Sequence, residues 1–171
     1  MEPVDITELY AAHRLPLVRL AVLLVDDLAS AEDVVQDAFA ALARRPDAVR
    51  DPSKALAYLR VSVVNTARSA LRRRRTARAY SPPHDVAPPS PEDRAVLAEE
   101  HREVITALHR LAPRQREVLV LRYWSNLSEA EIARTLDISQ GTVKSTASRA
   151  LVALERAMTA TAGSSSGKEE R

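Results

Sequence analysis

The side chains that could do chemistry gather in the second half of the chain, in a row of short polar and basic groups. On a helix starting near Ser139, the outer side would carry Gln140, Thr142, Lys144, Ser145, Ser148 and Arg149. Such groups form hydrogen bonds with base edges in a major groove and bind phosphates. No acidic residue lies between Gln140 and Arg149, whereas a face that is only solvated usually mixes both signs. The row therefore favours contact with duplex DNA.

A helix-turn-helix motif is predicted to position this row. Ser128 and Glu131 form a capping-box pair at the start of a short helix, and Ser139 caps the next helix. Between them Asp137 lies in a tight turn, where aspartate tolerates unusual backbone angles. The positions predicted to face the core are Ile132, Ala133, Leu136, Val143, Ala147, Ala150, Leu151 and Leu154. The alternative is an amphipathic helical hairpin whose polar face is only solvated.

A second cationic feature lies at the end of a predicted helix in the first half of the chain. Residues 52–90 carry eight basic and one acidic side chain, a net charge of +7, whereas residues 1–51 carry five basic and ten acidic, a net charge of −5. The run consists of Arg68, Arg72, Arg73, Arg74, Arg75 and Arg78. It attracts phosphates without sequence preference and makes binding salt-dependent. Cations at a helix C-terminus also interact with the helix dipole, but that alternative accounts for only one or two of the six arginines.

The residues that enzymes and metal sites require are sparse. Cysteine is absent, which excludes disulfides and thiolate sites. Of the four histidines, His101 and His109 are eight residues apart on one predicted helix, about 12 Å in rise, too far to share a metal. No glycine-rich phosphate loop occurs. The sequence therefore predicts no catalysis, no metal and no cofactor.

The pattern of breakers predicts an all-α fold of two small helical domains. Helices are expected from about Asp5 to Val25, from Ser30 with Asp33 as a capping pair, and after the cap Asp51-Pro52. Five of the ten prolines fall between positions 82 and 91, which predicts a stiff linker over residues 80–92. The domains would span residues 1–79 and 93–158, with a disordered tail over 159–171. The longest apolar run, Leu20–Val25, is too short for membrane insertion, and no signal peptide is expected.

Three stretches together resemble one protein family. Residues 30–42, SAEDVVQDAFAAL, are similar to the helix by which sigma factors bind RNA polymerase, and residues 57–75 are similar to the segment that melts and reads the −10 element. Residues 108–151 resemble region 4, which reads the −35 element. Their order and spacing are similar to the extracytoplasmic-function group, and most of all to its actinobacterial sigma-E-like members. The resemblance covers nearly all of residues 5–157.

The resemblance implies partners and site residues. The partners would be core RNA polymerase, through its beta and beta-prime subunits, and promoter DNA in the cytoplasm, at the nucleoid; sigma factors are also commonly held inactive by an anti-sigma factor. The residues that match the polymerase-binding face are Asp33, Gln36 and Asp37. Those that match the −10 helix and its basic end are Tyr58, Arg60, Asn65, Arg68, Arg72 and Arg73. Arg116, Arg122 and Lys144 match phosphate contacts of the −35 reader, and the other residues that match this reader are Gln140, Thr142, Ser145, Ser148 and Arg149.

The sequence therefore leaves two alternative functions. A sigma factor requires core polymerase and contacts DNA with both domains. A stand-alone transcriptional regulator would instead read DNA with the helix-turn-helix alone, commonly as a dimer on two half-sites, with the front helices as a sensor. The basic run at the end of the front domain fits a sensor poorly.

Overall fold

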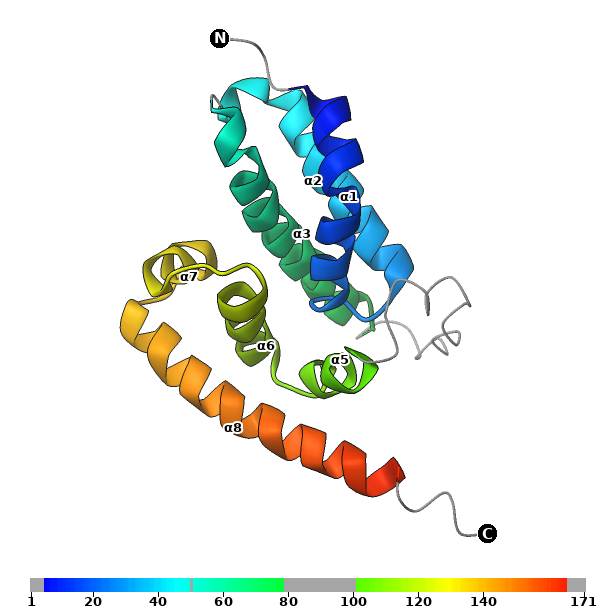
Figure 1. Ribbon diagram of the computed structural model, residues 1–171, viewed down its shortest axis with the longest axis vertical. Coiled ribbons are helices and arrows are strands. Elements are labelled where there is room, and N and C mark those ends of the chain that lie inside the picture. Colours follow the sequence, from blue (N-terminus) through cyan, green and yellow to red (C-terminus); the bar gives the residue numbers. More distant parts are fainter. Residues whose placement is uncertain (1–4, 50, 79–100, 166–171) are drawn as a thin grey trace. The chain divides into compact units, whose positions relative to one another are not determined.

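The computed structural model describes residues 5–49, 51–78 and 101–165, and the ordered elements within these ranges are all helical. The chain forms two compact units, Met1–Asp93 and Arg94–Arg171. The first unit contains the helices α1, α2 and α3, and the second contains α5, α6, α7 and α8 (Figure 1). The predicted all-α fold is confirmed, while the predicted linker, residues 80–92, lies outside the described residues.

Helix α1, Ile6–Val22, begins the first unit. Asp5 caps it, accepting a hydrogen bond from the Thr7 backbone N–H at 2.8 Å. The helix stops three residues before the predicted end, although Leu23, Leu24 and Val25 remain at most 3% exposed. The apolar pattern therefore predicted which residues are buried, but the buried segment extends beyond the end of the helix.

Helix α2, Leu28–Arg44, starts earlier than the sequence predicted. Its N-cap is Asp27, whose carboxylate accepts a hydrogen bond from the Ser30 backbone N–H at 2.8 Å. The predicted capping pair of Ser30 and Asp33 is therefore wrong: Ser30 is buried in the first turn, and Asp33 is exposed. Because Asp27 is the N-cap, Ser30 is not needed as a cap and is buried in the first turn of the helix.

Helix α3, Ala55–Arg78, carries the basic run. The short 3-10 helix Pro52–Lys54 (η2) leads directly into it, and Asp51 caps η2 as predicted. The buried residues of α3 are Ala55, Leu59, Val63, Val64 and Ala67. Leu56 and Leu71 of the same helix are only half-buried. The helix packs against both α1 and α2, so the first unit is a three-helix bundle with an aliphatic core.

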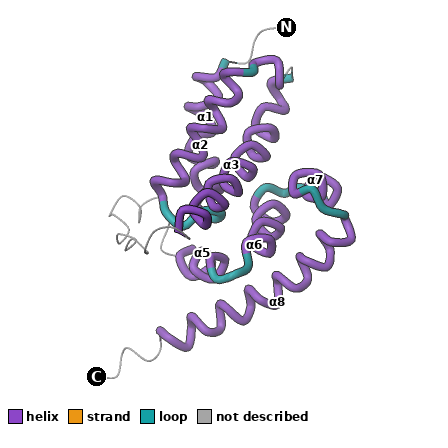
Figure 2. The backbone as a smooth tube through the Cα atoms, turned by 180° about the vertical axis from the view of Figure 1, so that it is seen from behind, coloured by secondary structure: helices purple, strands orange, loops and turns teal. Residues whose placement is uncertain are grey.

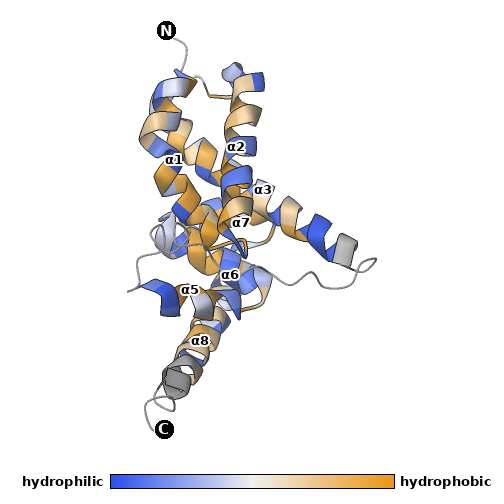
Figure 3. Ribbon diagram, turned by 90° about the vertical axis from the view of Figure 1, so that its right-hand side faces the viewer, coloured by the Kyte–Doolittle hydropathy of each residue, from blue (hydrophilic) through white to orange (hydrophobic). Residues whose placement is uncertain are grey.

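The second unit is arranged around α8, Gln140–Ser165. The helices α5 (Arg102–His109), α6 (Pro113–Leu119) and α7 (Glu129–Leu136) all pack against it (Figure 2). A π-helical turn, Val120–Trp124 (η4), continues α6. Coloured by hydropathy, the helices are apolar where they face their neighbours within each unit (Figure 3).

The helix-turn-helix is confirmed, but the prediction that Leu151 faces the core is wrong: Leu151 is 43% exposed, and Leu154 is only half-buried. In the capping box of α7 the Ser128 Oγ accepts from the Glu131 N–H at 3.3 Å, and the Ser128 N–H donates to the Glu131 carboxylate at 2.8 Å. Asp137 then takes a left-handed conformation, with φ 53° and ψ 55°. The Ser139 Oγ accepts from the Thr142 N–H at 3.0 Å and starts α8.

The end of α8 corrects the predicted boundary of the tail. The helix continues to Ser165, whereas disorder was predicted from residue 159. Met158, Thr159 and Ala160 are helix-compatible residues with no breaker before Gly163, so the helix has no local reason to stop at the domain edge. Over the described ranges, none of the helices has both the length and the apolar character needed to cross a membrane.

Candidate functional site

The predicted DNA-facing row lies on the outer side of α8. Its six residues, Gln140, Thr142, Lys144, Ser145, Ser148 and Arg149, are all exposed. The residues interleaved with them, Val143, Thr146, Ala147 and Ala150, are at most 5% exposed. The row is preorganised: the Arg149 Nε donates to the Ser145 carbonyl at 3.2 Å, and the Ser145 Oγ donates to the Thr142 carbonyl at 3.2 Å. The helix therefore presents short donors and acceptors with two cations, the inventory that a recognition helix needs.

Two cations of this surface share one carboxylate. The Arg122 Nη1 lies 3.3 Å from Glu129 Oε1, and the Lys144 Nζ lies 3.6 Å from Glu129 Oε2. The Arg122 guanidinium also lies over the Tyr123 ring, 5.8 Å from its centroid. The sequence placed Arg122 and Lys144 among the phosphate-binding residues but overlooked Glu129. Position 129 is the residue after a cap, where an acidic side chain is common, so local pattern gave no sign of a second role.

Arg116 does not belong to this surface, which corrects the prediction that it binds phosphate. It is 7% exposed, and its Nη2 donates to the His109 carbonyl at 3.4 Å within the second unit. Arg116 lies on α6, whose residues Arg116 to Leu119 are all buried. The side chain therefore packs inside the unit, although its residue type suggested exposure.

The residues expected to bind polymerase form one exposed face of α2. Asp33, Gln36 and Asp37 are spaced by three and four residues, so they share one side of the helix. All three are exposed, while Val34, Val35 and Ala38 are at most 2% exposed on the opposite side. The result is a small acidic surface that the core of the bundle holds in place.

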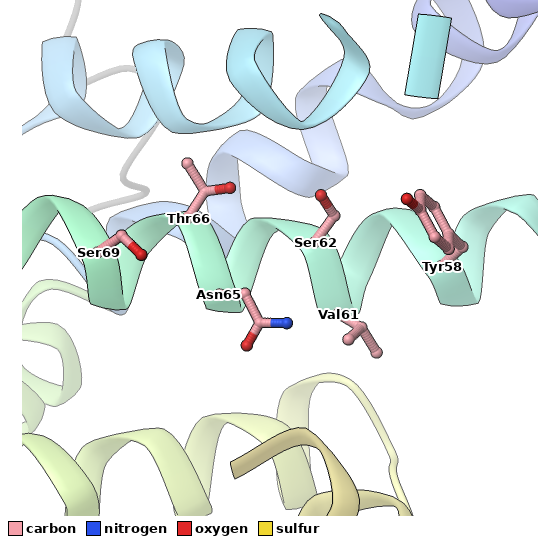
Figure 4. A pocket seen from close by; sticks show the side chains of 6 residues that line it. All are labelled: Tyr58, Val61, Ser62, Asn65, Thr66 and Ser69. Carbon is pink, nitrogen blue, oxygen red and sulfur yellow. The ribbon is translucent and has the colours of Figure 1, made fainter. Parts of the chain in front are cut away.

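The −10 candidates lie along α3. Tyr58 and Asn65 line an open groove together with Val61, Ser62, Thr66 and Ser69 (Figure 4). Figure 4 shows Asn65 and Val61 pointing to the same side of the helix. The hydroxyl, amide and ring groups of this groove can hydrogen-bond to a base or stack on it. The sequence did not identify Ser62, Thr66 and Ser69, because single hydroxyls on a helix carry no motif.

The arginines of α3 differ in their surroundings. Arg72 and Arg73 are exposed, and Arg60 and Arg68 are half-buried. Arg74 instead reaches α2: its Nη1 donates to Asp27 Oδ2 at 2.9 Å, and its Nη2 donates to the Ser30 Oγ. One cation of the basic run is therefore used inside the first unit. Its partner Asp27 lies 47 residues away in sequence, so no local pattern could reveal the pairing.

The Asp27 carboxyl is held in its ionised form by these contacts. Burial raises its pKa, but hydrogen bonds from the Ser30 backbone and hydroxyl and from Arg74 lower it by more. The pKa of Asp27 consequently lies below its ordinary value of 3.8. Among the described residues, no group of three or more histidine, aspartate or glutamate side chains could hold a metal ion.

Comparisons with known proteins match the two units separately. Residues 9–77 match the family described as Sigma-70 region 2, and residues 101–154 match the family described as Sigma-70, region 4. The RNA polymerase sigma-E factor of Streptomyces coelicolor is 36% identical over 162 residues, which cover 93% of this chain and 89% of that protein.

Two solved structures are similar over nearly the whole chain. One is the sigma factor RpoE in complex with the anti-sigma factor NepR from Bartonella quintana, with a TM-score of 0.67, 25% identity and coverage of 90% of this chain and 95% of that one. The other is CnrH in complex with the cytosolic domain of CnrY, with a TM-score of 0.61, 28% identity and coverage of 91% and 88%. Both likenesses extend over both units of the fold.

Proposed function

The chain belongs to the sigma-70 family of RNA polymerase sigma factors, in its extracytoplasmic-function (ECF) group. From this family membership we propose how its two units divide promoter recognition. As an alternative sigma factor, the protein binds core polymerase and directs it to start transcription at specific promoters. The observation that carries the proposal is the exposed row on α8, which contains two cations and no acid and is held by a complete helix-turn-helix.

The second unit reads the −35 element with α8. Gln140, Ser145 and Ser148 carry short polar groups that can meet base edges in the major groove. Lys144 and Arg149, on the same helix, bind phosphates, which fixes the register of the helix on the duplex. Arg122, at the end of η4, is the third phosphate-binding candidate.

The first unit holds the opened −10 element along α3. The groove that Tyr58 and Asn65 line offers a ring for stacking and an amide for hydrogen bonding to an unpaired base. The exposed guanidinium groups of Arg72 and Arg73 bind the backbone near the end of the same helix. The half-buried Arg60 and Arg68 lie on the same helix and complete the set of predicted contacts.

The acidic face of α2 binds core polymerase. Asp33, Gln36 and Asp37 are exposed side by side on the helix, which suits a partner surface that is basic and rich in hydrogen-bond donors. The beta and beta-prime subunits of the polymerase would supply that surface. An anti-sigma factor that covers these surfaces would keep the protein inactive, as the similar complexes suggest.

RNA synthesis remains with the polymerase, and this chain itself catalyses no reaction. Its place of action is the cytoplasm, at the nucleoid, where polymerase and promoters are found.

Run-off transcription with purified core polymerase on a library of genomic fragments tests this function. We expect products with defined 5′ ends that share sequence near −35 and −10. Asp33→Lys with Asp37→Lys should abolish them by weakening polymerase binding, and Arg149→Gln should reduce them by weakening DNA contact. Absence of promoter-specific products with the wild-type chain would contradict the proposal.

A further inference from the structure

We infer that Glu129 limits sequence-independent DNA binding by holding Arg122 and Lys144 in ion pairs that a DNA phosphate must displace. The inference rests on the proposed role of α8 in binding duplex DNA. The other residues proposed for this surface favour DNA binding, whereas Glu129 opposes it.

The geometry joins three elements at one carboxylate. Glu129 is the first residue of α7, Arg122 lies in η4, and Lys144 lies on α8. Each carboxylate oxygen faces a different cation, at 3.3 Å and 3.6 Å. The Glu129 side chain is 27% exposed, so solvent and a docked phosphate can both reach the bridge.

The charges explain why the bridge opposes phosphate binding. A phosphate group carries the same sign as Glu129 and seeks the same two donors, so the two compete for Arg122 and Lys144. Sequence-independent affinity depends on how many cations are available to neutralise phosphates. Because Arg122 and Lys144 are already paired with Glu129, the surface binds less tightly to a duplex that offers only phosphate contacts.

The base-reading residues are not affected in the same way. Gln140, Ser145 and Ser148 are neutral, and the ion pairs of Glu129 are with Arg122 and Lys144, so the bridge weakens phosphate contact and leaves base contact unchanged. A site that offers base contacts still binds after this cost, because those contacts supply affinity that does not depend on the bridge. The bridge therefore lowers the affinity for duplexes of every sequence by a similar factor, and sites that lack base contacts are the first to lose measurable binding.

A role in holding Lys144 in position is the competing explanation, and the structure favours it less. The Lys144 side chain is 68% exposed, and its 3.6 Å pair is long for a charge-assisted hydrogen bond. Exposed pairs of this kind restrict a flexible lysine only slightly. The repulsion between the negative charge of Glu129 and the DNA phosphates is therefore a larger effect than the positioning of Lys144.

Fluorescence anisotropy of the full chain with a pool of random-sequence duplexes, over a range of salt concentrations, measures the effect. Glu129→Gln should tighten binding by up to about fivefold, the factor equivalent to a surface ion pair. It should also steepen the plot of log affinity against log salt by about 0.9 for each cation released. The matched control is Glu155→Gln, an exposed acid on α8 with the same change of charge, which should change neither quantity by a comparable amount. Equal or weaker binding by Glu129→Gln would overturn the inference.

A second comparison starts from the wild-type chain, with Glu129 intact, and then repeats one substitution in the Glu129→Gln background. In the wild-type background, Lys144→Gln should change random-duplex affinity less than Arg149→Gln does, because Glu129 already occupies Lys144. In the Glu129→Gln background the loss caused by Lys144→Gln should grow, which a double-mutant cycle measures. A loss of the same size in both backgrounds would contradict the bridge.

The same experiments separate this inference from the proposed function. If Arg149→Gln and Lys144→Gln leave wild-type affinity unchanged, α8 does not bind DNA and both proposals fail. If Arg149→Gln weakens binding but Glu129→Gln does not tighten it, only the inference fails.

Discussion

Arg74, near the end of α3, donates a hydrogen bond to the carboxylate of Asp27 at 2.9 Å, at the start of α2. Asp27 is also the cap of α2, so the same carboxylate starts one helix and anchors the end of another. The helix with the proposed polymerase-binding face and the helix with the proposed −10 surface are therefore joined at this point.

This contact predicts that neighbouring arginines have different roles. Arg74→Gln should lower the free energy of unfolding by about 0.5–1 kcal/mol, the range of a partly exposed ion pair, as measured by urea denaturation. Arg73→Gln is the matched control, because Arg73 is exposed and replaced by the same residue. It should leave stability nearly unchanged but reduce the salt dependence of single-stranded DNA binding by about 0.7 in slope. Equal effects of both variants on stability would contradict the assignment.

Asp27 also predicts how stability depends on pH. Its pKa in the folded chain lies below the unfolded value near 3.8, so the folded state favours the ionised carboxylate. The resulting stabilisation is fully present above the unfolded pKa and is lost as pH falls through the folded pKa. Urea denaturation of the wild type and of Asp27→Asn from pH 6 to pH 3 should show a stability difference that shrinks at the acid end. A difference that is constant or larger at pH 3 would refute this assignment of charge.

The left-handed residue in the helix-turn-helix gives a backbone prediction. Asp137 has φ 53°, a conformation that costs a residue with a Cβ atom about 1 kcal/mol more than it costs glycine. Asp137→Gly should therefore raise the thermal midpoint of the second unit, and Asp137→Val, which is β-branched, should lower it. Calorimetry of both variants provides the measurement, and a stabilising valine would show that the turn is not held as described.

The capping box predicts a comparable effect at the other end of α7. Ser128→Ala removes the side-chain acceptor for the Glu131 backbone and should destabilise the second unit by about 1 kcal/mol. Ser128→Asp keeps an acceptor at the cap and should retain most of the stability. If alanine and aspartate variants unfold at the same denaturant concentration, the hydrogen bonds of the box contribute nothing measurable.

Features encoded by neighbouring residues could be predicted from the sequence. The capping box of Ser128 and Glu131, the left-handed Asp137 and the exposed row on α8 depend on local spacing, and the structure contains each of them. The helical fold follows in the same way from apolar periodicity and few breakers.

Features that depend on distant contacts could not be predicted. Arg74 meets Asp27 across 47 positions, and Arg116 is buried because α6 packs inside the second unit. The start of α2 was misplaced because Ser30 and Asp33 form as good a local capping pattern as Asp27 does, and only packing decides between them. The bridge at Glu129 was missed for the same reason, since it joins three elements.

Footprinting of promoter DNA with and without core polymerase tests the central claim most directly. We predict that the wild-type chain with core polymerase protects two regions, near −35 and −10, and that the chain alone protects neither at the same concentration. Protection that is equally strong without polymerase, or that covers two symmetric half-sites, would contradict the account and indicate a stand-alone regulator.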